Sequence, residues 1–131
     1  DTPHFIPKKY TMNIGKTGET GERMVADFMR KKGCTVIKRN YQCRFGEIDI
    51  IAETKEYIIF TEVKTRAESS MVSPAESVDR RKQQRIVLAA EDFLSKYETE
   101  LQPRFDVAEV TVFKKSDSQY GYRLNYIKNA F

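Results

Sequence analysis

The stretch GEIDIIAETKEYIIFTEVKTR, residues 46–66, decides the fold. Two runs rich in isoleucine, valine and aromatic residues flank a polar turn near Lys55. β-branched and aromatic residues favour strands, so the stretch predicts two antiparallel strands joined by a short turn. Three charged residues interrupt these apolar runs, namely Asp49, Glu62 and Lys64. Charged side chains within core strands cost free energy unless they are paired, bind a metal or face a cleft.

Composition limits the classes to which the chain can belong. With 131 residues it has the size of one domain, large enough to bury a core without disulfides or a structural metal. Its apolar runs are shorter than a membrane span and its first residues resemble no secretory signal, so we expect a cytoplasmic protein without a membrane partner. Cys34 and Cys43 lack metal-ligand spacing and are expected to be reduced thiols. His4 is the single histidine, so any catalysis must use carboxylates and lysine.

The chain is expected to form one α/β domain. Residues 1–12 contain two prolines and no periodicity, so they are treated as an irregular extension of a domain spanning 13–131. Helices are predicted over 13–32 and from the tetrapeptide SPAE at 73–76, and strands over 34–41, 45–53, 57–66, 104–114 and 120–126. The order α-β-β-β-α-β-β predicts a central mixed sheet of five strands flanked by helices.

Each predicted helix carries a stripe that should face the sheet. In the first helix the stripe is Gly18, Glu22, Val25, Ala26 and Met29. In the second it is Ile86, Ala90, Phe93 and Tyr97. Glycines at threefold spacing in the first helix would let another backbone come close.

Charged side chains of the predicted hairpin should meet at one end. Residues two apart in a strand share a face, so Glu62 and Lys64 project together. Pairing through the turn near Lys55 places Asp49 about opposite Glu62. Neighbouring strands lie about 4.8 Å apart, so both carboxylates can reach one hard cation. Glu22, on the stripe of the first helix, is the candidate third acid.

This set of residue types suits phosphodiester hydrolysis. Carboxylates supply oxygen ligands to Mg²⁺ or Mn²⁺, which neutralises a phosphate oxygen and lowers the pKa of a bound water. A lysine beside the metal can orient that water or stabilise transition-state charge. Each residue alone also fits a structural role: an ion pair for Glu62 with Lys64, a surface acid for Glu22, and a turn-flanking acid for Asp49. Their joint occurrence favours the site.

Basic residues are unevenly distributed along the chain. Residues 30–44 contain six basic residues and no acid, and residues 80–85 form a second basic group. Such groups favour phosphate backbones, although a solvated basic face is the alternative. The candidate nucleic-acid-binding residues are Arg30, Lys31, Lys32, Lys38, Arg39, Arg44, Arg66, Arg80, Arg81, Lys82 and Arg85.

Several ordered motifs resemble one known family. GETGERMVADFMRKKG, IKRNYQCRFGEIDIIA, FTEVKTR, RFDVAEVTV and IKNAF are similar to motifs of bacterial YraN-like proteins, which have the PD-(D/E)XK nuclease fold and are similar to archaeal Holliday junction resolvases. The resemblance implies a restriction-endonuclease-like domain with Asp49, Glu62 and Lys64 as its Asp and Glu-x-Lys motif. Glu22 would be the additional helix acid, and Ile48 replaces the proline before the aspartate. Further residues in family motifs, without an assigned role, are Asn40, Lys82, Arg104 and Asp106.

We therefore expect a metal-dependent endonuclease acting on DNA, selective for branched or junction structures. Asp49 and Glu62 would bind Mg²⁺ or Mn²⁺, Glu22 would bind it directly or through water, and Lys64 would position the attacking water. The main alternative is a non-catalytic nucleic-acid-binding accessory protein in DNA uptake, recombination or repair. A third is a protein-interaction domain. A homodimer is expected by analogy alone.

Overall fold

The hairpin expected over residues 46–66 forms the middle of the sheet. The structure is a computed structural model that describes residues 4–5, 17–68 and 78–131. In it β3 (Gly46–Glu53) and β4 (Tyr57–Ala67) pair antiparallel, with Ile50 opposite Thr61 and Glu53 opposite Ile58. The Thr54 hydroxyl accepts hydrogen bonds from the backbone of the turn, which closes the hairpin.

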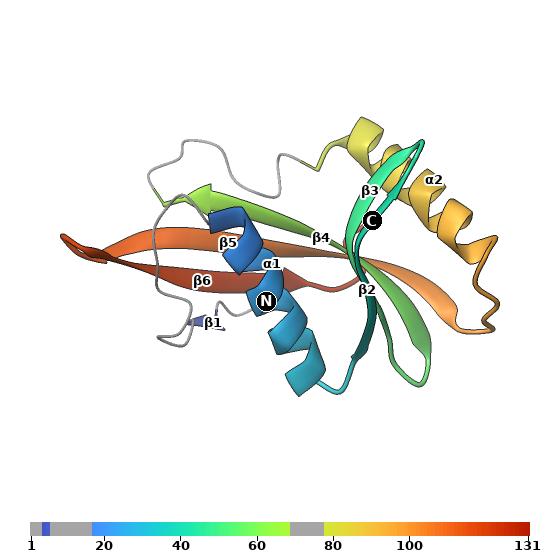
Figure 1. Ribbon diagram of the computed structural model, residues 1–131, viewed down its shortest axis with the longest axis horizontal. Helices are drawn as coiled ribbons and strands as arrows, with labels where there is room; N and C mark the ends of the chain where they lie inside the picture. The colour runs from blue at the N-terminus through green and yellow to red at the C-terminus, as the bar shows by residue number, and fades with distance from the viewer. Residues whose placement is uncertain (1–3, 6–16, 69–77) are drawn as a thin grey trace.

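The remaining elements follow the predicted order (Figure 1). They are β1 (His4–Phe5), α1 (Thr17–Lys31), β2 (Thr35–Cys43), α2 (Arg80–Leu94), β5 (Gln102–Ser116) and β6 (Gln119–Ile127). The α-β-β-β-α-β-β order and the five expected strands are confirmed. One difference lies at the beginning of the chain, where two of the residues predicted to be irregular, His4 and Phe5, pair with β6 as a short additional strand.

The sheet is mixed, with the order β1-β6-β5-β4-β3-β2. β4 and β5 are parallel, while the other neighbouring pairs are antiparallel. A parallel pair needs a crossover connection, and the segment that contains α2 supplies it. No helix in the described part of the chain has the length and apolar character needed to cross a membrane.

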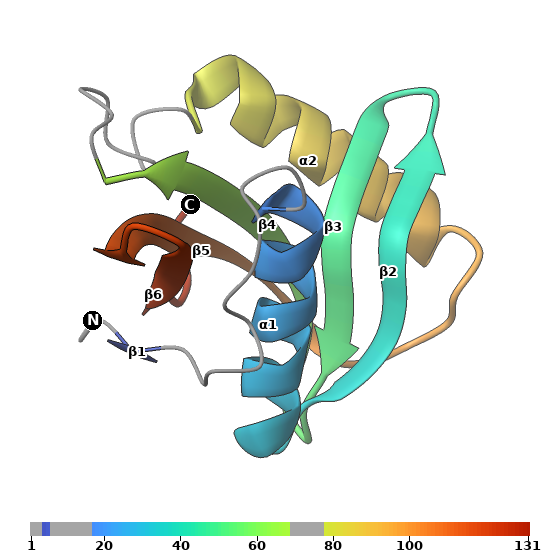
Figure 2. The ribbon, with the colours of Figure 1, turned by 60° about the vertical axis from the view of Figure 1, so that its left-hand side comes forward.

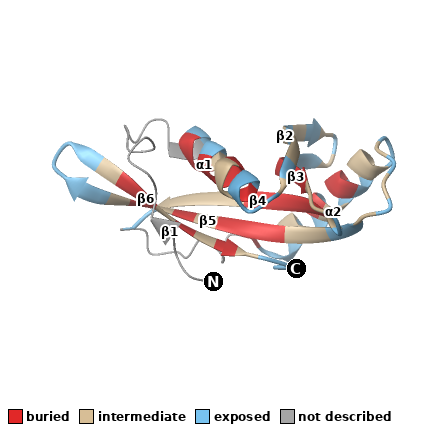
Figure 3. Cartoon of the chain, turned by 90° about the horizontal axis from the view of Figure 1, so that it is seen from below, coloured by how far each residue is buried: buried red, intermediate tan, exposed pale blue. Residues whose placement is uncertain are grey.

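Two hydrophobic cores lie on opposite faces of the sheet, one under each helix (Figure 2). Alternation along β4 divides the side chains, because Ile59 joins the core under α1 while Ile58 and Phe60 join the core under α2. Burial follows the same pattern in Figure 3, with the buried residues along the middle of the sheet and the exposed ones towards the tip of the β5–β6 hairpin.

The sheet-facing stripe predicted for α1 is present. Val25, Ala26 and Met29 are fully or almost fully buried. A Cβ atom at Gly21 would lie 2.6 Å from the Thr65 hydroxyl oxygen of β4, so glycine here makes room for a side chain, whereas the sequence predicted the approach of another backbone. Gly33, with a φ of 94°, ends the helix in the left-handed region.

The limits of α2 differ from the prediction. The predicted start at 73–76 lies outside the described residues, and the observed helix begins at Arg80 after the N-cap Asp79, whose side chain accepts a hydrogen bond from the backbone N–H of Lys82. Tyr97 was expected on the helix but follows its end. It nevertheless packs on the helix, because its ring stacks on that of Phe93 at 5.0 Å.

A buried carboxylate fastens the end of the chain to the sheet. Asp106 is fully buried and receives two hydrogen bonds from the Arg104 guanidinium, at 3.0 and 2.9 Å. The Tyr126 hydroxyl donates to it at 2.6 Å and the Asn129 backbone N–H at 2.9 Å. Arg104 and Asp106, to which the sequence assigned no role, therefore form a structural ion pair, because each lone pair of a buried carboxylate needs a donor.

Replacement of Tyr126 by phenylalanine should destabilise the fold. The change removes a donor from a buried carboxylate, so we expect the free energy of unfolding to fall by about 1–3 kcal/mol. Tyr97→Phe is the matched control, because its hydroxyl donates to Glu53 at a more exposed site and its loss should be smaller. Urea unfolding of both variants measures the difference, and equal losses would contradict the role given to Tyr126.

Candidate functional site

The sheet divides next to the hairpin and leaves a pocket. Backbone pairing of β3 with β4 ends at Ile50 and Thr61, after which residues 46–48 stay paired with β2 and residues 62–67 with β5. We call this opening between residues 46–49 and 62–67 the fork. α1 reaches it from one face of the sheet and α2 from the other, so side chains of four elements meet there.

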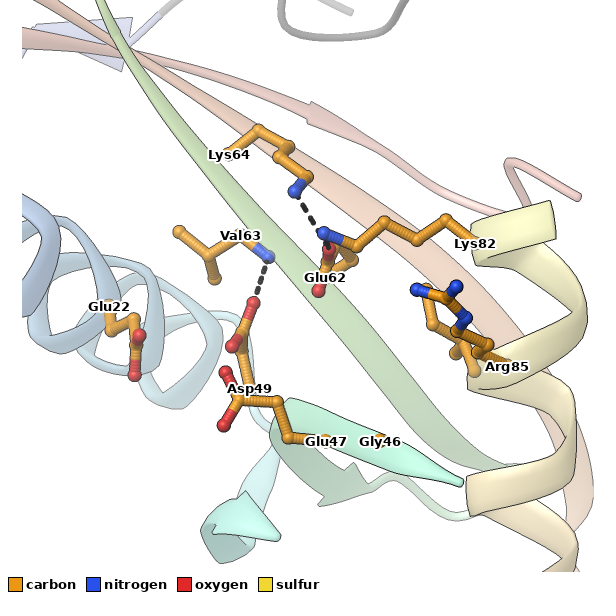
Figure 4. A pocket seen from close by; sticks show the side chains of 10 residues that line it. Glu22, Gly46, Glu47, Asp49, Glu62, Val63, Lys64, Lys82 and Arg85 are labelled. Carbon is orange, nitrogen blue, oxygen red and sulfur yellow. Dashed lines mark hydrogen bonds and ion pairs between the residues drawn. The ribbon is translucent and has the colours of Figure 1, made fainter. Parts of the chain in front are cut away.

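The fork contains a pocket of about 390 Å³ (Figure 4). Its charged lining residues are Glu22 of α1, Glu47 and Asp49 of β3, Glu62 and Lys64 of β4, and Lys82 and Arg85 of α2. All four residues predicted to form the catalytic site therefore line one pocket. Glu47 was not predicted to line this pocket. It lies two residues before Asp49 on the same strand and therefore on the same face, and this spacing could have identified it.

Asp49 and Glu62 form a buried carboxylate pair. Their exposed fractions are 6% and 5%, and Asp49 Oδ2 accepts a hydrogen bond from the Val63 backbone N–H at 2.7 Å. Burial, the charge of Glu62 and a hydrogen bond between the two carboxyl groups raise the pKa of Asp49 to about 8. Burial also opposes ionisation of Glu62, but hydrogen bonds from Asp49 and Lys82 lower its pKa. Near neutral pH the pair therefore holds one proton, on Asp49.

Two lysines contact the same oxygen of Glu62. Lys82 Nζ lies 2.7 Å and Lys64 Nζ 3.1 Å from Glu62 Oε2. Burial and the neighbouring Lys82 lower the pKa of Lys64, against the opposing effect of Glu62. The pKa of Lys82 is raised because its hydrogen bonds to Glu62 and Lys64 outweigh burial. Lys82 therefore keeps its proton more readily than Lys64 does.

Glu22 faces the pair from α1. It is half-buried, and burial raises its pKa while Arg39 opposes the shift and Glu47 and Glu62 add to it. Its carboxylate accepts a hydrogen bond from the side chain of Asn40 on β2. Asn40 has a φ of 54°, a conformation that asparagine tolerates better than most residues. The contact with Glu22 gives Asn40 a structural role, which the sequence alone did not assign.

The side chains that could bind a metal ion are the buried carboxylates of Asp49 and Glu62. Within residues 4–5, 17–68 and 78–131 there is no group of three His, Cys, Asp or Glu side chains that could hold a metal ion. Mg²⁺, however, is often bound by one or two carboxylates together with water and substrate phosphate. Asp49 and Glu62 fit that pattern, since both are buried, share a hydrogen bond and open to one pocket. Glu22 lines the same pocket and interacts electrostatically with Glu62.

Some of the predicted basic residues lie at the pocket. Lys82 and Arg85 line it, and Arg39 interacts electrostatically with Glu22. Arg80 and Arg81 are exposed in the first turn of α2.

The other basic residues lie further away. The basic residues at 30–32 lie at and just after the C-terminal end of α1, about 13 Å along the helix from Glu22, and Arg30 pairs with Asp27. Arg44 covers the Phe45 ring and Lys38 is exposed on β2. Arg66 is half-buried on β4, beyond Lys64.

Comparison with known proteins identifies the family. The model of the family described as "Uncharacterised protein family UPF0102" matches residues 21–110. The chain belongs to the UPF0102 family. The matched range contains every charged residue of the pocket, from Glu22 to Arg85. This agrees with the YraN-like resemblance found in the sequence, whereas membership of the PD-(D/E)XK superfamily stays a prediction.

Relatives of the UPF0102 family match over most of their length. A UPF0102 protein of Caldanaerobacter subterraneus subsp. tengcongensis is 38% identical, over 92% of this chain and 98% of the relative. One from Clostridium acetobutylicum is 40% identical over 88% and 93%, and one from Clostridium perfringens is 42% identical over 95% and 98%. The chain is therefore similar to complete UPF0102 proteins.

The proton on Asp49 predicts how stability depends on pH. The pKa of Asp49 is about 8 in the folded state and near 3.8 in the unfolded state, so the folded state binds the extra proton between these values. This contribution to stability is complete below about pH 4 and is lost as pH rises towards 8, by at most about 1.4 kcal/mol per pH unit. Asp49→Asn should remove the decline. Urea unfolding of both proteins from pH 5 to 8 in EDTA tests this, and parallel curves would contradict it.

Proposed function

We propose that this UPF0102 chain is a metal-dependent nuclease of the PD-(D/E)XK type that hydrolyses phosphodiester bonds in DNA. The observation that carries the proposal is the convergence of Asp49, Glu62 and Lys64 in one pocket, with Glu22 facing them from α1. These are the residues of the Asp and Glu-x-Lys motif and of the additional helix acid. Two buried carboxylates that share one proton keep one negative charge between them. A divalent cation in place of that proton would neutralise the pair more fully.

Each residue has a defined task in this proposal. Asp49 and Glu62 would hold Mg²⁺ or Mn²⁺, with Glu22 reaching it through water. The metal, when bound, would neutralise phosphate charge and lower the pKa of a bound water. The Val63 N–H fixes the Asp49 carboxylate, because its hydrogen bond to Oδ2 orients the other oxygen towards the pocket. Lys64 would orient the attacking water and stabilise the charge that develops in the transition state.

The start of α2 supports a role in holding phosphate. Its first turn contains three basic residues and no acid, although the helix dipole disfavours cations there. Lys82 of this turn and Arg85 line the pocket, which places positive charge on one side of it. Phosphate oxygens would be stabilised both by this charge and by the helix N-terminus. Because no base-reading motif accompanies the basic residues, selectivity is proposed to depend on DNA shape, with branched DNA as the preferred substrate.

A specific observation favours the alternative of a non-catalytic DNA-binding accessory protein. Two ammonium groups already neutralise Glu62, and the described residues provide no three-acid metal group. A basic surface with an internally neutralised pocket could bind DNA without cutting it. The two proposals differ in whether divalent metal binds and whether DNA is cleaved.

Cleavage assays on matched variants separate these proposals. Linear, flapped and four-way-junction DNA are incubated with and without Mn²⁺, beside Glu62→Ala as the inactive control. Lys64→Ala should retain DNA binding and lose at least about 100-fold in the single-turnover cleavage rate, since the lysine acts in the transition state. Absence of cleavage by the wild-type protein on every substrate would favour the accessory role, and equal rates for wild type and Lys64→Ala would remove the role of Lys64.

Charge removal in the first turns of α2 should weaken DNA binding more than charge removal elsewhere. The triple variant Arg80→Ala, Arg81→Ala and Arg85→Ala should lower the affinity for DNA and reduce the slope of log K against log salt by about 0.9 for each lost phosphate contact. The matched control changes the three basic residues at 30–32 to alanine, which lie at the distant end of α1. Fluorescence anisotropy over a salt series gives both slopes. Equal slopes would show that the start of α2 is not the principal phosphate contact.

A further inference from the structure

Lys82 reaches the buried Glu62 from a different element. Lys64 is fixed on the same strand as Glu62, two residues away, whereas Lys82 extends from α2 on the opposite side of the pocket (Figure 4). It makes the shorter of the two contacts, 2.7 Å against 3.1 Å, to the same oxygen. Its side chain is 37% exposed, while those of Lys64 and Glu62 are 19% and 5% exposed. A partly exposed ammonium therefore covers a buried carboxylate.

The backbone of Lys82 is fixed although its ammonium is accessible. The N-cap Asp79 accepts a hydrogen bond from the Lys82 backbone N–H at 2.9 Å, and the Gln83 side chain donates to the Val78 carbonyl at 3.1 Å. The four-carbon side chain can therefore swing without any change in α2. The ion pair with Glu62, at 2.7 Å, holds the Lys82 ammonium in the pocket.

A divalent ion at Glu62 would compete with this ammonium. An oxygen that already contacts two ammonium groups cannot also bind Mg²⁺ or Mn²⁺ without displacement of one of them, since like charges a few ångströms apart repel strongly outside bulk water. Lys64 is less exposed and is attached to the sheet beside Glu62. Lys82 can move into solvent from its position on α2. Lys82 is therefore the cation that gives way.

We propose that Lys82 is a displaceable counter-ion, which positions Glu62 in the metal-free protein and must leave it when a divalent cation binds. The inference rests on the proposed metal site at Asp49 and Glu62. It adds Lys82 of α2 to that site. The effect of Lys82 on metal affinity is opposite to that of the carboxylates. Removal of a carboxylate weakens metal binding, whereas removal of the Lys82 ammonium strengthens it.

Calorimetric titration of the full-length chain with Mn²⁺, in the absence of DNA, tests the proposal. Lys82→Met should lower the Kd for Mn²⁺ by about fivefold or more, because no ammonium from α2 then competes with the metal ion for Glu62. Fivefold is the lower end of the coupling usually found between two binding events. Lys82→Arg keeps the positive charge and should stay close to the wild type. Arg85→Met removes an exposed charge from the same pocket that forms no ion pair with Glu62, and should change the Kd by less than about twofold because exposed charges are screened. Circular dichroism melting confirms folding, and Lys82→Gln is the second variant if Lys82→Met does not fold.

The outcomes separate this inference from the proposed function. Equal Mn²⁺ affinities for the wild type, Lys82→Met and Lys82→Gln would overturn the inference alone, as would an equal gain for Arg85→Met. Absence of Mn²⁺ binding in every protein would overturn both the inference and the proposed metal site. A tighter Kd for Lys82→Met without DNA cleavage by any protein would support the inference while the nuclease proposal fails.

Discussion

The end of backbone pairing between β3 and β4 is the constraint on which the site depends. Beyond Ile50 and Thr61 the two strands separate, and the Val63 N–H, which a longer hairpin would pair with backbone, is satisfied by the Asp49 carboxylate instead. A buried N–H requires an acceptor, so the carboxylate stabilises the fork and is at the same time held in place by it. The opening admits side chains from both helices into one pocket, although the helices lie on opposite faces of the sheet.

Charge balance within the fork explains why its residues occur together. Two buried carboxylates cannot both ionise without nearby cations, and the structure provides a proton on Asp49 and two ammonium groups on Glu62. Removal of the Glu62 carboxylate would leave two ammonium groups close together without their counter-ion. The carboxylate of Asp106 presents the same difficulty and is neutralised by a single arginine and by fixed hydrogen-bond donors, without a pocket. An open pocket with a partly exposed ammonium suits exchange of cations, whereas a fully buried network suits stability.

Much of the fold could be predicted because its signals are local. The period-2 pattern around the hairpin specified β3 and β4, and the apolar stripe of the first helix specified which of its faces packs on the sheet. The errors have physical causes too. The observed α2 begins after the Asp79 cap, while the predicted start at 73–76 lies outside the described residues, and Tyr97 continues the helical spacing after the helix has ended at Leu94. The short pairing of His4 and Phe5 depends on the edge of β6, a strand remote in sequence. No pattern in the residues near the N-terminus indicates this pairing.

By itself, the sequence determined the order of the elements, the residue types able to bind a cation, and the alignment of Asp49 with Glu62, because hairpin register follows from local spacing. It could not place Lys82 on Glu62, pair Glu22 with Asn40 or exclude the basic residues at 30–32 from the pocket. The first two contacts each join a helix to a strand that is remote in sequence, and the third depends on the distance between the two ends of one helix. Only the tertiary structure decided them, because the distance between residues remote in sequence depends on how the helices pack and on where the sheet divides.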